Sequence, residues 1–224
     1  MAGRKSRAPL TRPKTPRQMA AVRKAVDMTG RIFRELDSPF GRSEADVARE
    51  IRRRAKALGA GLAFPPIVAS GCNSGYVHHK PGAKIVRGDE TVIFDVGFRA
   101  GGQCTDVTRM HIPNCRRDRK LLRDMLSIQK RCIAMSRPGV TLKAINDEFR
   151  RLMKKKGYKV RHSIGHGVGL HVHERAKALK PGMVITVEPG VYERKKRGCR
   201  VEDMVLVTRG GPKILTGNVK FRQA

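Results

Sequence analysis

The order of the hydrophobic patterns along this chain restricts the fold it can adopt. Helical spacing of apolar residues predicts four helices, over 16–36, from the N-cap Ser43 to Gly59, over 117–136 and over 141–156. Short β-branched runs broken by glycine and proline predict strands over about 62–110 and over most of 160–208. Helices therefore precede strands twice. This order predicts an α+β fold with two pseudo-symmetric halves.

The length and the composition favour one domain with a real core. The chain has 224 residues, of which 39% are hydrophobic and 30% charged, values typical of globular rather than disordered proteins. We expect residues 15–224 to form a single domain and residues 1–14 to form a flexible basic tail.

The charge balance is extreme, with 49 Lys and Arg against 19 Asp and Glu, a formal net charge of +30 at pH 7. A surface of this kind attracts polyanions, and ribosomal RNA or another nucleic acid is the candidate partner. With 7 Phe, 3 Tyr and no Trp, base-stacking platforms are scarce, so the contacts would be mainly to phosphates. A basic helix face can also be merely solvated, and that alternative stays open.

Cysteine usage and hydropathy bear on the compartment. The 5 cysteines are widely spaced and include no Cys-x-x-Cys pair, which favours a reducing compartment. No apolar run reaches the roughly 18 residues that a membrane span needs, and the N-terminus lacks the apolar core of a secretory signal. We therefore expect a cytoplasmic protein that does not enter membranes. The first acidic residue is Asp27, so import into an organelle is the alternative.

Two aspartates flank a glycine pair in the first strand region. Pairing Asp95 with Asp106 in a hairpin places the turn at about Arg99 to Gly102. The two carboxylates would then face each other, with Cβ atoms roughly 4.5 to 5.5 Å apart. Two like charges so close need a cation or a shared proton, and a divalent metal is the natural candidate. The alternative is a pair of exposed aspartates beside a turn.

Two glutamates lie in apolar surroundings further along the chain. Glu188 and Glu202 both fall inside runs that predict strands, where a carboxylate is rarely buried unless it is paired or coordinated. Between the two carboxylate pairs lies the glycine- and histidine-rich segment 162–173, whose imidazoles can bind metal or transfer protons. Four carboxylates and one histidine suit two divalent cations. Oxygen ligands favour Mn, with Co, Fe and Zn as alternatives.

These residues and the blocks around them resemble the pita-bread metallopeptidases, the family of methionine aminopeptidase, prolidase and aminopeptidase P. The resemblance extends from about residue 15 to the C-terminus. The matching blocks are 64–73, Val77-His78, 95–97, 106–109, 164–170, His173-Glu174, 179–183, 188–192 and 200–203. The resemblance implies a pita-bread fold, in which two pseudo-symmetric α-β halves surround a central curved antiparallel sheet.

The resemblance also implies a role for each site residue. The five metal ligands would be Asp95, Asp106, His166, Glu188 and Glu202, with Asp106 and Glu202 bridging two divalent metal ions. A metal-bridging hydroxide would attack the N-terminal peptide bond, and Glu188 would act as general base. The histidines His78 and His173 would line the cleft, one stabilising the oxyanion and the other contacting the substrate. His162 and Arg200 match positions that assist the ligands without binding the metal ions themselves, and Tyr192 matches a cleft position.

Some neighbouring residues have no role in the family. We expect His79 and His171 to be exposed or locally hydrogen-bonded. Because the ligand set is already complete, we expect no metal ligand among Cys72, Cys104 and Cys199.

The motifs are most similar to the branch of the family that cleaves Xaa-Pro bonds. Glu188-Pro-Gly-Val-Tyr192 and Arg200-Val-Glu-Asp203 resemble that branch, whereas Gln103 stands where the family often has Tyr. The sequence does not include the N-terminal domain that shapes the substrate site and the dimer in prolidases and aminopeptidases P. We expect an aminopeptidase of the Xaa-Pro or prolidase type that is a monomer. The alternative substrate is the initiator methionine of nascent chains, with the enzyme docked on the ribosome.

A function of another class is a catalytically silent pita-bread protein that binds nucleic acid or the ribosome. The fold alone does not decide between the two classes. Relatives without catalysis generally lose metal ligands, whereas here all five ligand positions are filled and His78 and His173 are present. The sequence therefore favours the peptidase.

Overall fold

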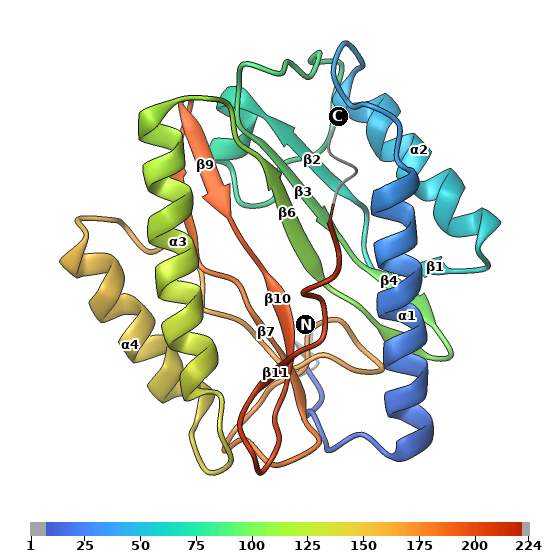
Figure 1. Ribbon diagram of the computed structural model, residues 1–224, viewed down its shortest axis with the longest axis vertical. Coiled ribbons are helices and arrows are strands. Elements are labelled where there is room, and N and C mark those ends of the chain that lie inside the picture. The colour runs from blue at the N-terminus through green and yellow to red at the C-terminus, as the bar shows by residue number, and fades with distance from the viewer. Residues whose placement is uncertain (1–7, 221–224) are drawn as a thin grey trace, which may run out of the picture.

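The four helices lie in two pairs on either side of the strands (Figure 1). The computed structural model describes residues 8–220. Its helices are α1 (Pro16–Glu35), α2 (Glu44–Ala57), α3 (Arg116–Met135) and α4 (Leu142–Lys155). All four predicted helices are thus confirmed to within about two residues. None of the described helices is long and apolar enough to cross a membrane.

Side-chain caps explain where three of these helices begin. Thr15 forms a capping box with Gln18, and Pro16 occupies the first helical turn of α1. Ser43 accepts a hydrogen bond from the Asp46 amide, and Thr141 accepts one from the amide of Ala144. Each cap satisfies an amide that the helix itself leaves unpaired.

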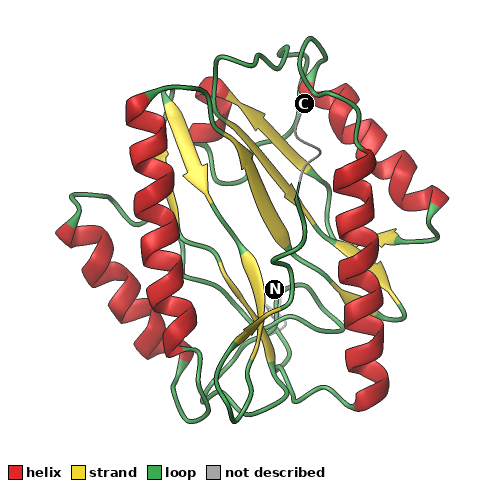
Figure 2. Cartoon of the chain, viewed as in Figure 1, coloured by secondary structure: helices red, strands yellow, loops and turns green. Residues whose placement is uncertain are grey.

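The strands form four small antiparallel sheets among the described residues (Figure 2). In the first half the sheet order β2-β3-β6 comprises Ile67–Ser70, Val92–Val96 and Val107–His111, and the order β1-β4-β5 comprises Gly61–Leu62, Phe98–Ala100 and Gln103–Cys104. A short 3₁₀ helix, Gly71–Gly75, follows β2. In the second half the order β11-β10-β7 comprises Lys213–Ile214, Asp203–Leu206 and Val184–Val187, and β8 (Gly190–Glu193) pairs with β9 (Arg197–Arg200).

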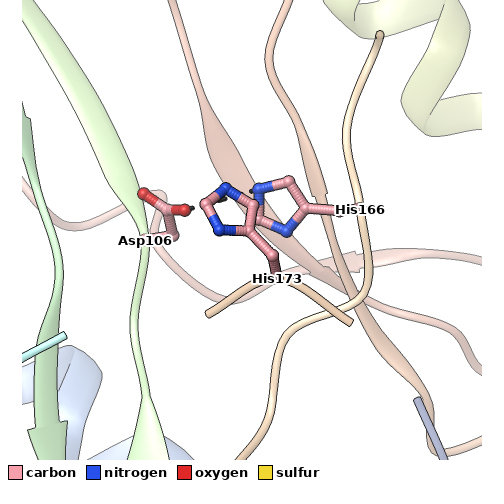
Figure 3. A group of neighbouring side chains, drawn as sticks. All are labelled: Asp106, His166 and His173. Atoms are coloured by element: carbon pink, nitrogen blue, oxygen red, sulfur yellow. Dashed lines mark ion pairs between the residues drawn. The ribbon is translucent and has the colours of Figure 1, made fainter. Parts of the chain in front are cut away.

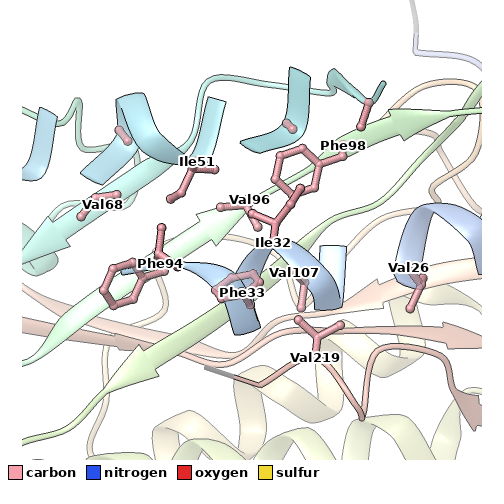
Figure 4. Close-up of a cluster of buried hydrophobic side chains, with 14 of the residues drawn as sticks. Val26, Ile32, Phe33, Ile51, Val68, Phe94, Val96, Phe98, Val107 and Val219 are labelled. Carbon is pink, nitrogen blue, oxygen red and sulfur yellow. The ribbon is translucent and has the colours of Figure 1, made fainter. Parts of the chain in front are cut away.

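Each half has its own hydrophobic core. In the first, Ile32 of α1 and Ile51 of α2 belong to one buried cluster with Phe98 of β4 (Figure 4). In the second, Met125 of α3 and Phe149 of α4 belong to a cluster with residues of β7 to β10. Burial of each such side chain contributes roughly 1.5–3 kcal/mol. The predicted two-halved α+β architecture is confirmed.

The hairpin that carries the two aspartates has a different register from the predicted one. Asp95 pairs with Thr108, and the turn consists of Gly101 and Gly102 alone, with φ of 55° and 76°. The prediction that Asp95 directly faces Asp106 is therefore wrong. Two adjacent glycines form the tightest hairpin turn, which requires positive φ at both positions, and this turn moves the pairing by two residues. An even shift keeps both carboxylates on one face of the hairpin.

Residues 160–183 form no strand, so the prediction of strands over most of 160–208 is wrong for this segment. The segment instead runs alongside β7 and is joined to its edge by single hydrogen bonds. Examples are Thr186 N to His166 O at 2.8 Å and Glu188 N to Ile164 O at 2.8 Å. A Cβ atom at Gly165 would lie 2.1 Å from the Thr186 carbonyl oxygen. The backbones approach so closely that only glycine fits, and this places the histidine-rich segment beside β7.

Residues 8–14, named here the N-terminal strap, lie against the second half of the chain. The Thr11 amide donates to Arg175 O at 2.8 Å, and the Lys14 amide donates to Gly182 O at 2.8 Å. The Lys14 side chain, only 5% exposed, lies 3.6 Å from Glu174. These contacts do not fit the flexible tail expected over 1–14. Residues 1–7 lie outside the described residues.

Candidate metal centre

The five predicted ligand residues line one cavity of about 460 Å³. Asp95 lies in β3, and Asp106 lies between β5 and β6. His166 comes from the segment 160–183, which precedes β7 in the chain and runs beside it, while Glu188 and Glu202 lie beyond the ends of β7 and β9. Both halves therefore contribute to one cavity wall.

The prediction that both glutamates lie inside strands is wrong by a residue or so. Glu188 directly follows β7 because Pro189 cannot extend the ladder of backbone hydrogen bonds. Glu202 lies where the chain leaves β9, which pairs with β8, and enters β10, which pairs with β7. At such interruptions of the backbone hydrogen-bond ladder, the side chains of Glu188 and Glu202 face the cavity and do not pack on the face of a sheet.

The ligand atoms form two groups that share one residue. Oxygens of Asp95, Asp106 and Glu202 lie within 4.8 Å of one another, and so do ligand atoms of His166, Glu188 and Glu202. Asp106 Oδ2 also lies 3.5 Å from His166 Nε2, which brings it next to the second group. Glu202 therefore belongs to both groups.

His173 lies close to the same groups. A ligand atom of His173 is within 4.8 Å of atoms of Asp106 and His166, and the three side chains point toward one another (Figure 3). The ring centroids of His166 and His173 are 4.3 Å apart. Unlike the five residues above, His173 is exposed.

The hydrogen bonds of His166 leave one nitrogen free for a metal. Its Nδ1 donates to the Gly167 carbonyl oxygen at 3.1 Å, so Nε2 of the neutral ring carries a lone pair. This Nε2 faces Glu188 Oε1 at 3.3 Å and Asp106 Oδ2 at 3.5 Å. Metal-binding histidines typically donate their second N–H to a carbonyl in this way.

The carboxylates repel one another in the absence of a cation. Burial, and then the charge of Glu202, raises the pKa of Asp106 well above its ordinary value. Burial, and then the charge of Glu188, does the same to the pKa of Glu202. Burial would also raise the pKa of Glu188, but in the metal-free site the combined interactions with His166, His162 and Arg200 outweigh it and lower this pKa. Asp95 Oδ1 is buried without a hydrogen-bond partner among the described residues. This donor set fits divalent cations, which would supply the missing positive charge.

A second layer of hydrogen bonds orients the ligands. Arg200 donates to Asp95 Oδ2 at 2.7 Å and to the Tyr192 hydroxyl at 2.7 Å. Its Nε donates to the Thr108 hydroxyl, which in turn donates to Glu202 Oε2 at 2.8 Å. Thr108 was not singled out in the sequence, although strand alternation from Asp106 places it on the ligand face.

His162 and Tyr192 lie at the far end of this layer. His162 Nδ1 donates to Ser163 O at 2.8 Å, so its Nε2 accepts from the Tyr192 hydroxyl at 3.0 Å. Tyr192 is 5% exposed and contacts the ligands through Arg200 instead of lining the cavity. The structure therefore brings both residues behind the ligands.

The remaining histidines differ in their surroundings. His78 lines the cavity, as predicted, and is exposed. His171 is also exposed. His79 was expected to be exposed or locally bonded, but it lies 2.7 Å from Glu44 Oε2, and Glu44 is fully buried on α2. This long-range pair leaves no signal in local sequence. In the described part of the chain no cysteine joins a group of metal-ligating residues.

A second cavity, of about 410 Å³, also borders the two central histidines. It is lined by His166 and His173 together with Ala8 and Leu10 of the N-terminal strap. The strap therefore reaches the immediate surroundings of the site.

Comparison with known proteins gives a consistent result. A sequence model of metallopeptidase family M24 matches residues 20–209. An Xaa-Pro dipeptidase of Pyrococcus furiosus is 34% identical over 218 residues, which cover 91% of this chain and 62% of that protein. An uncharacterized peptidase of Staphylococcus saprophyticus is 33% identical over 92% of this chain and 63% of that protein.

Solved structures give the same result. An X-Pro aminopeptidase from Thermotoga maritima superimposes with a TM-score of 0.86 at 32% identity, over 91% of this chain and 61% of that chain. This chain thus spans somewhat less than two thirds of the length of the relatives it matches.

Proposed function

The chain belongs to metallopeptidase family M24, and from this premise we propose that it is a metal-dependent peptidase that hydrolyses the N-terminal peptide bond of Xaa-Pro peptides. Its fold is the pita-bread fold of prolidases and aminopeptidase P. The observation that carries the proposal is the convergence of five metal-ligating residues in two groups that share Glu202. The names of the matched relatives, an Xaa-Pro dipeptidase and an X-Pro aminopeptidase, support the Xaa-Pro preference. Removal of initiator methionine remains the alternative.

The proposed metal site follows the two groups. Asp95, Asp106 and Glu202 would hold one divalent cation, and His166, Glu188 and Glu202 would hold the other, with Asp106 shared. Two cations bound there would supply Lewis acidity, which lowers the pKa of a water molecule and polarises a carbonyl group. Mn is the favoured metal, with Co, Fe and Zn as alternatives.

The chain's own residues perform the remaining steps. Glu188 accepts the proton of the attacking water and passes it to the leaving nitrogen. His78 and His173 line the cavity and donate hydrogen bonds to the carbonyl oxygen and to the substrate. The apolar wall of Phe64, Pro65 and Ile67 holds substrate side chains and excludes water.

The proposal is tested with metal-stripped protein reloaded with Mn, Co, Fe or Zn. The substrates are an Xaa-Pro dipeptide, an Xaa-Pro tripeptide and Met-Ala-Ser. Asp106→Asn removes a shared ligand, and Asp147→Asn, at an exposed position of α4, is the matched control. Hydrolysis of the Xaa-Pro peptides that depends on metal, and that only Asp106→Asn abolishes, is expected. Preferential cleavage of Met-Ala-Ser would select the alternative, and no cleavage with any metal would overturn the proposal.

A second proposed activity is the docking of ribosomal RNA on the basic surface. Several exposed Arg and Lys side chains on α3 and α4 form no ion pair with any described carboxylate: Arg116, Arg119, Arg123, Lys130, Arg150, Lys154 and Lys155. Phosphate contacts release counterions, so affinity should fall steeply as salt rises. Binding of a labelled RNA duplex at 50 and 200 mM salt tests this. Binding that ignores salt would contradict it.

We also propose a cytoplasmic location and a monomer. All five cysteines are free, which supports a reducing compartment, with an organelle as the alternative. Like-charge repulsion at a net charge of +30 opposes self-association. Light scattering at physiological salt would distinguish a monomer from a dimer.

A further inference from the structure

His78 reaches the cavity from a loop in which its own side chain has no support. This loop, residues 76–82, follows the short 3₁₀ helix Gly71–Gly75. The His78 side chain lines the cavity, is exposed, and forms no hydrogen bond or ion pair with any residue of 8–220. The position of His78 in the cavity wall therefore depends on the residues on either side of it.

Both neighbours of His78 are held by buried charged groups. Before it, the Val77 carbonyl oxygen accepts a hydrogen bond from Arg200 Nη1 at 3.3 Å. After it, His79 Nε2 lies 2.7 Å from Glu44 Oε2. Arg200 is 2% exposed and Glu44 is 0% exposed, so both anchors lie in the interior. The chain at His78 is thus held from two sides.

The Glu44 carboxylate is balanced by hydrogen-bond donors. It accepts from the Ser70 amide at 2.7 Å, from the Ser70 hydroxyl at 2.8 Å and from Asn73 Nδ2 at 3.1 Å. Burial would raise the pKa of Glu44, but the hydrogen bonds from Ser70, His79 and Asn73 together outweigh it and lower this pKa. An ionised carboxylate only accepts hydrogen bonds, so Nε2 of His79 carries the proton that the pair shares.

Glu44 also holds the far end of the loop. It accepts a hydrogen bond from the Gly82 amide at 3.3 Å, and the Ala45 amide donates to the Gly82 carbonyl oxygen at 3.0 Å. Without the His79 ring, the loop would keep its attachment at Gly82 and lose the one next to His78. The His79 contact is therefore the one that acts directly on the position of His78.

We propose that Glu44 and His79 are positioning residues for His78: the buried carboxylate holds the His79 imidazole, and this holds the adjacent His78 side chain at the cavity wall. The inference rests on the proposed peptidase function, in which His78 meets the substrate. His79 also borders the cavity, but its Nε2 proton is committed to Glu44. It therefore positions a neighbour and does not itself donate that proton to the substrate.

The test uses two substitutions of His79 and one matched control. His79→Ala removes the hydrogen bond, and His79→Gln replaces the ring by an amide that can still donate to Glu44. The control is Glu50→Gln, which removes another buried carboxylate charge of α2. Glu50 is paired with Arg42 and Arg54 instead of the loop. A purely structural role would give His79→Ala and Glu50→Gln the same phenotype, a loss of stability alone.

The expected results concern kcat/KM for an Xaa-Pro dipeptide. His79→Ala should lower it about tenfold, because a displaced catalytic group loses its geometry. His79→Gln should restore most of this loss, and Glu50→Gln should leave kcat/KM unchanged. In a His78→Ala background, His79→Ala should cause no further loss. Losses of equal size in both backgrounds would overturn the inference, and so would a His79→Gln variant no better than His79→Ala.

A measurement without turnover separates this inference from the proposed function. Nuclear magnetic relaxation of the metal-free protein gives the order parameter of the His78 amide. It should be about 0.85 in the wild type, in His79→Gln and in Glu50→Gln, and below about 0.6 in His79→Ala. That result would support the positioning even if no peptide were cleaved, and only the proposed function would then fail. An unchanged order parameter in His79→Ala would overturn the positioning while leaving the peptidase intact.

Discussion

Arg200 donates a hydrogen bond to Asp95 Oδ2 at 2.7 Å, and the other oxygen of that carboxylate, Oδ1, is buried without a hydrogen-bond partner in the described part of the chain. The two oxygens of one side chain thus have separate surroundings. One is held by a buried guanidinium that also contacts Tyr192 and Thr108. The other is available to the cation proposed above. Arg200 therefore orients Asp95 without neutralising its ligand oxygen.

Replacing Arg200 with Met should weaken metal binding. Loss of an outer partner of a metal ligand typically costs 10–100-fold in affinity, and we expect a decrease of that order. Competition with a chelator measures the affinity, and circular dichroism checks that the variant is folded. Arg200→Lys, which keeps the charge but loses the planar fork, should give an intermediate value. Arg150→Met, at an exposed position, is the control, and equal affinities in all variants would contradict the assignment.

Asp106→Asn should stabilise the metal-free protein. Because burial and Glu202 raise the pKa of Asp106 well above 3.8, the folded state holds a proton that the unfolded state releases. The free energy of unfolding therefore falls as the pH rises from about 3.8 through the raised pKa. A neutral amide removes this cost, with an expected gain of about 1–2 kcal/mol at pH 7.5 in EDTA.

The same variant should lose stabilisation by metal. At a metal concentration 100 times Kd, the wild-type protein should gain about 2.7 kcal/mol, and Asp106→Asn much less. Urea denaturation with EDTA and with Mn measures both effects. A variant that is less stable than wild type in EDTA would show that repulsion does not dominate the metal-free site.

Lys14→Met should lower kcat with little change in KM. Lys14 lies 3.6 Å from Glu174, the residue after His173, and both side chains are nearly buried. Loss of this pair should move His173, and small displacements of a catalytic group cost about tenfold or more in rate. Lys24→Met, at an exposed position of α1, is the control.

A double variant identifies the route of this effect. If Lys14 acts by positioning His173, Lys14→Met should cause no further loss of kcat in a His173→Ala background. Its effect on thermal stability should persist there. Equal losses of kcat in both backgrounds would mean that the strap affects activity by another path.

Glu50→Gln should destabilise the protein at neutral pH and not in acid. Burial would raise the pKa of Glu50, but hydrogen bonds from Arg42 and Arg54 outweigh it and lower this pKa to about 2. Stability from this carboxylate is therefore present above pH 4.5 and is lost as the pH falls toward 2. We expect a loss of about 2–3 kcal/mol at pH 7 that shrinks below pH 3. Urea denaturation at both pH values measures it, and the exposed Asp147→Asn should cost only a few tenths.

Local patterns predicted the helices because their determinants are local. The caps Thr15, Ser43 and Thr141 lie three residues from the amides they satisfy. The glycine pair at 101–102 was visible, but a sequence pattern does not measure the length of a turn, so the register of Asp95 was misjudged. The four carboxylates were singled out by their spacing and surroundings, and His166 was predicted from the resemblance to the pita-bread metallopeptidases; neither inference depends on that register.

Contacts between distant residues could not be predicted from the sequence. Glu44 and His79 are 35 residues apart, and Lys14 and Glu174 belong to opposite halves of the chain. Neither pair leaves a periodic signal. The residue pattern of segment 160–183 resembles that of a strand. The segment does lie beside β7, yet its hydrogen bonds there are single bridges and form no continuous ladder. The contribution of Thr108 likewise became visible only once its partners were placed.

The N-terminal strap has a practical consequence for handling the protein. Since Ala8 borders a cavity that is also lined by His166 and His173, a peptide fused directly before Ala8 would begin beside the histidines of the proposed metal centre. A polyhistidine purification tag fused there would offer imidazoles and a flexible peptide to the groups proposed to bind metal and substrate. A tag held away from this cavity avoids that competition, so the two tagged forms should differ in apparent metal content before they differ in fold.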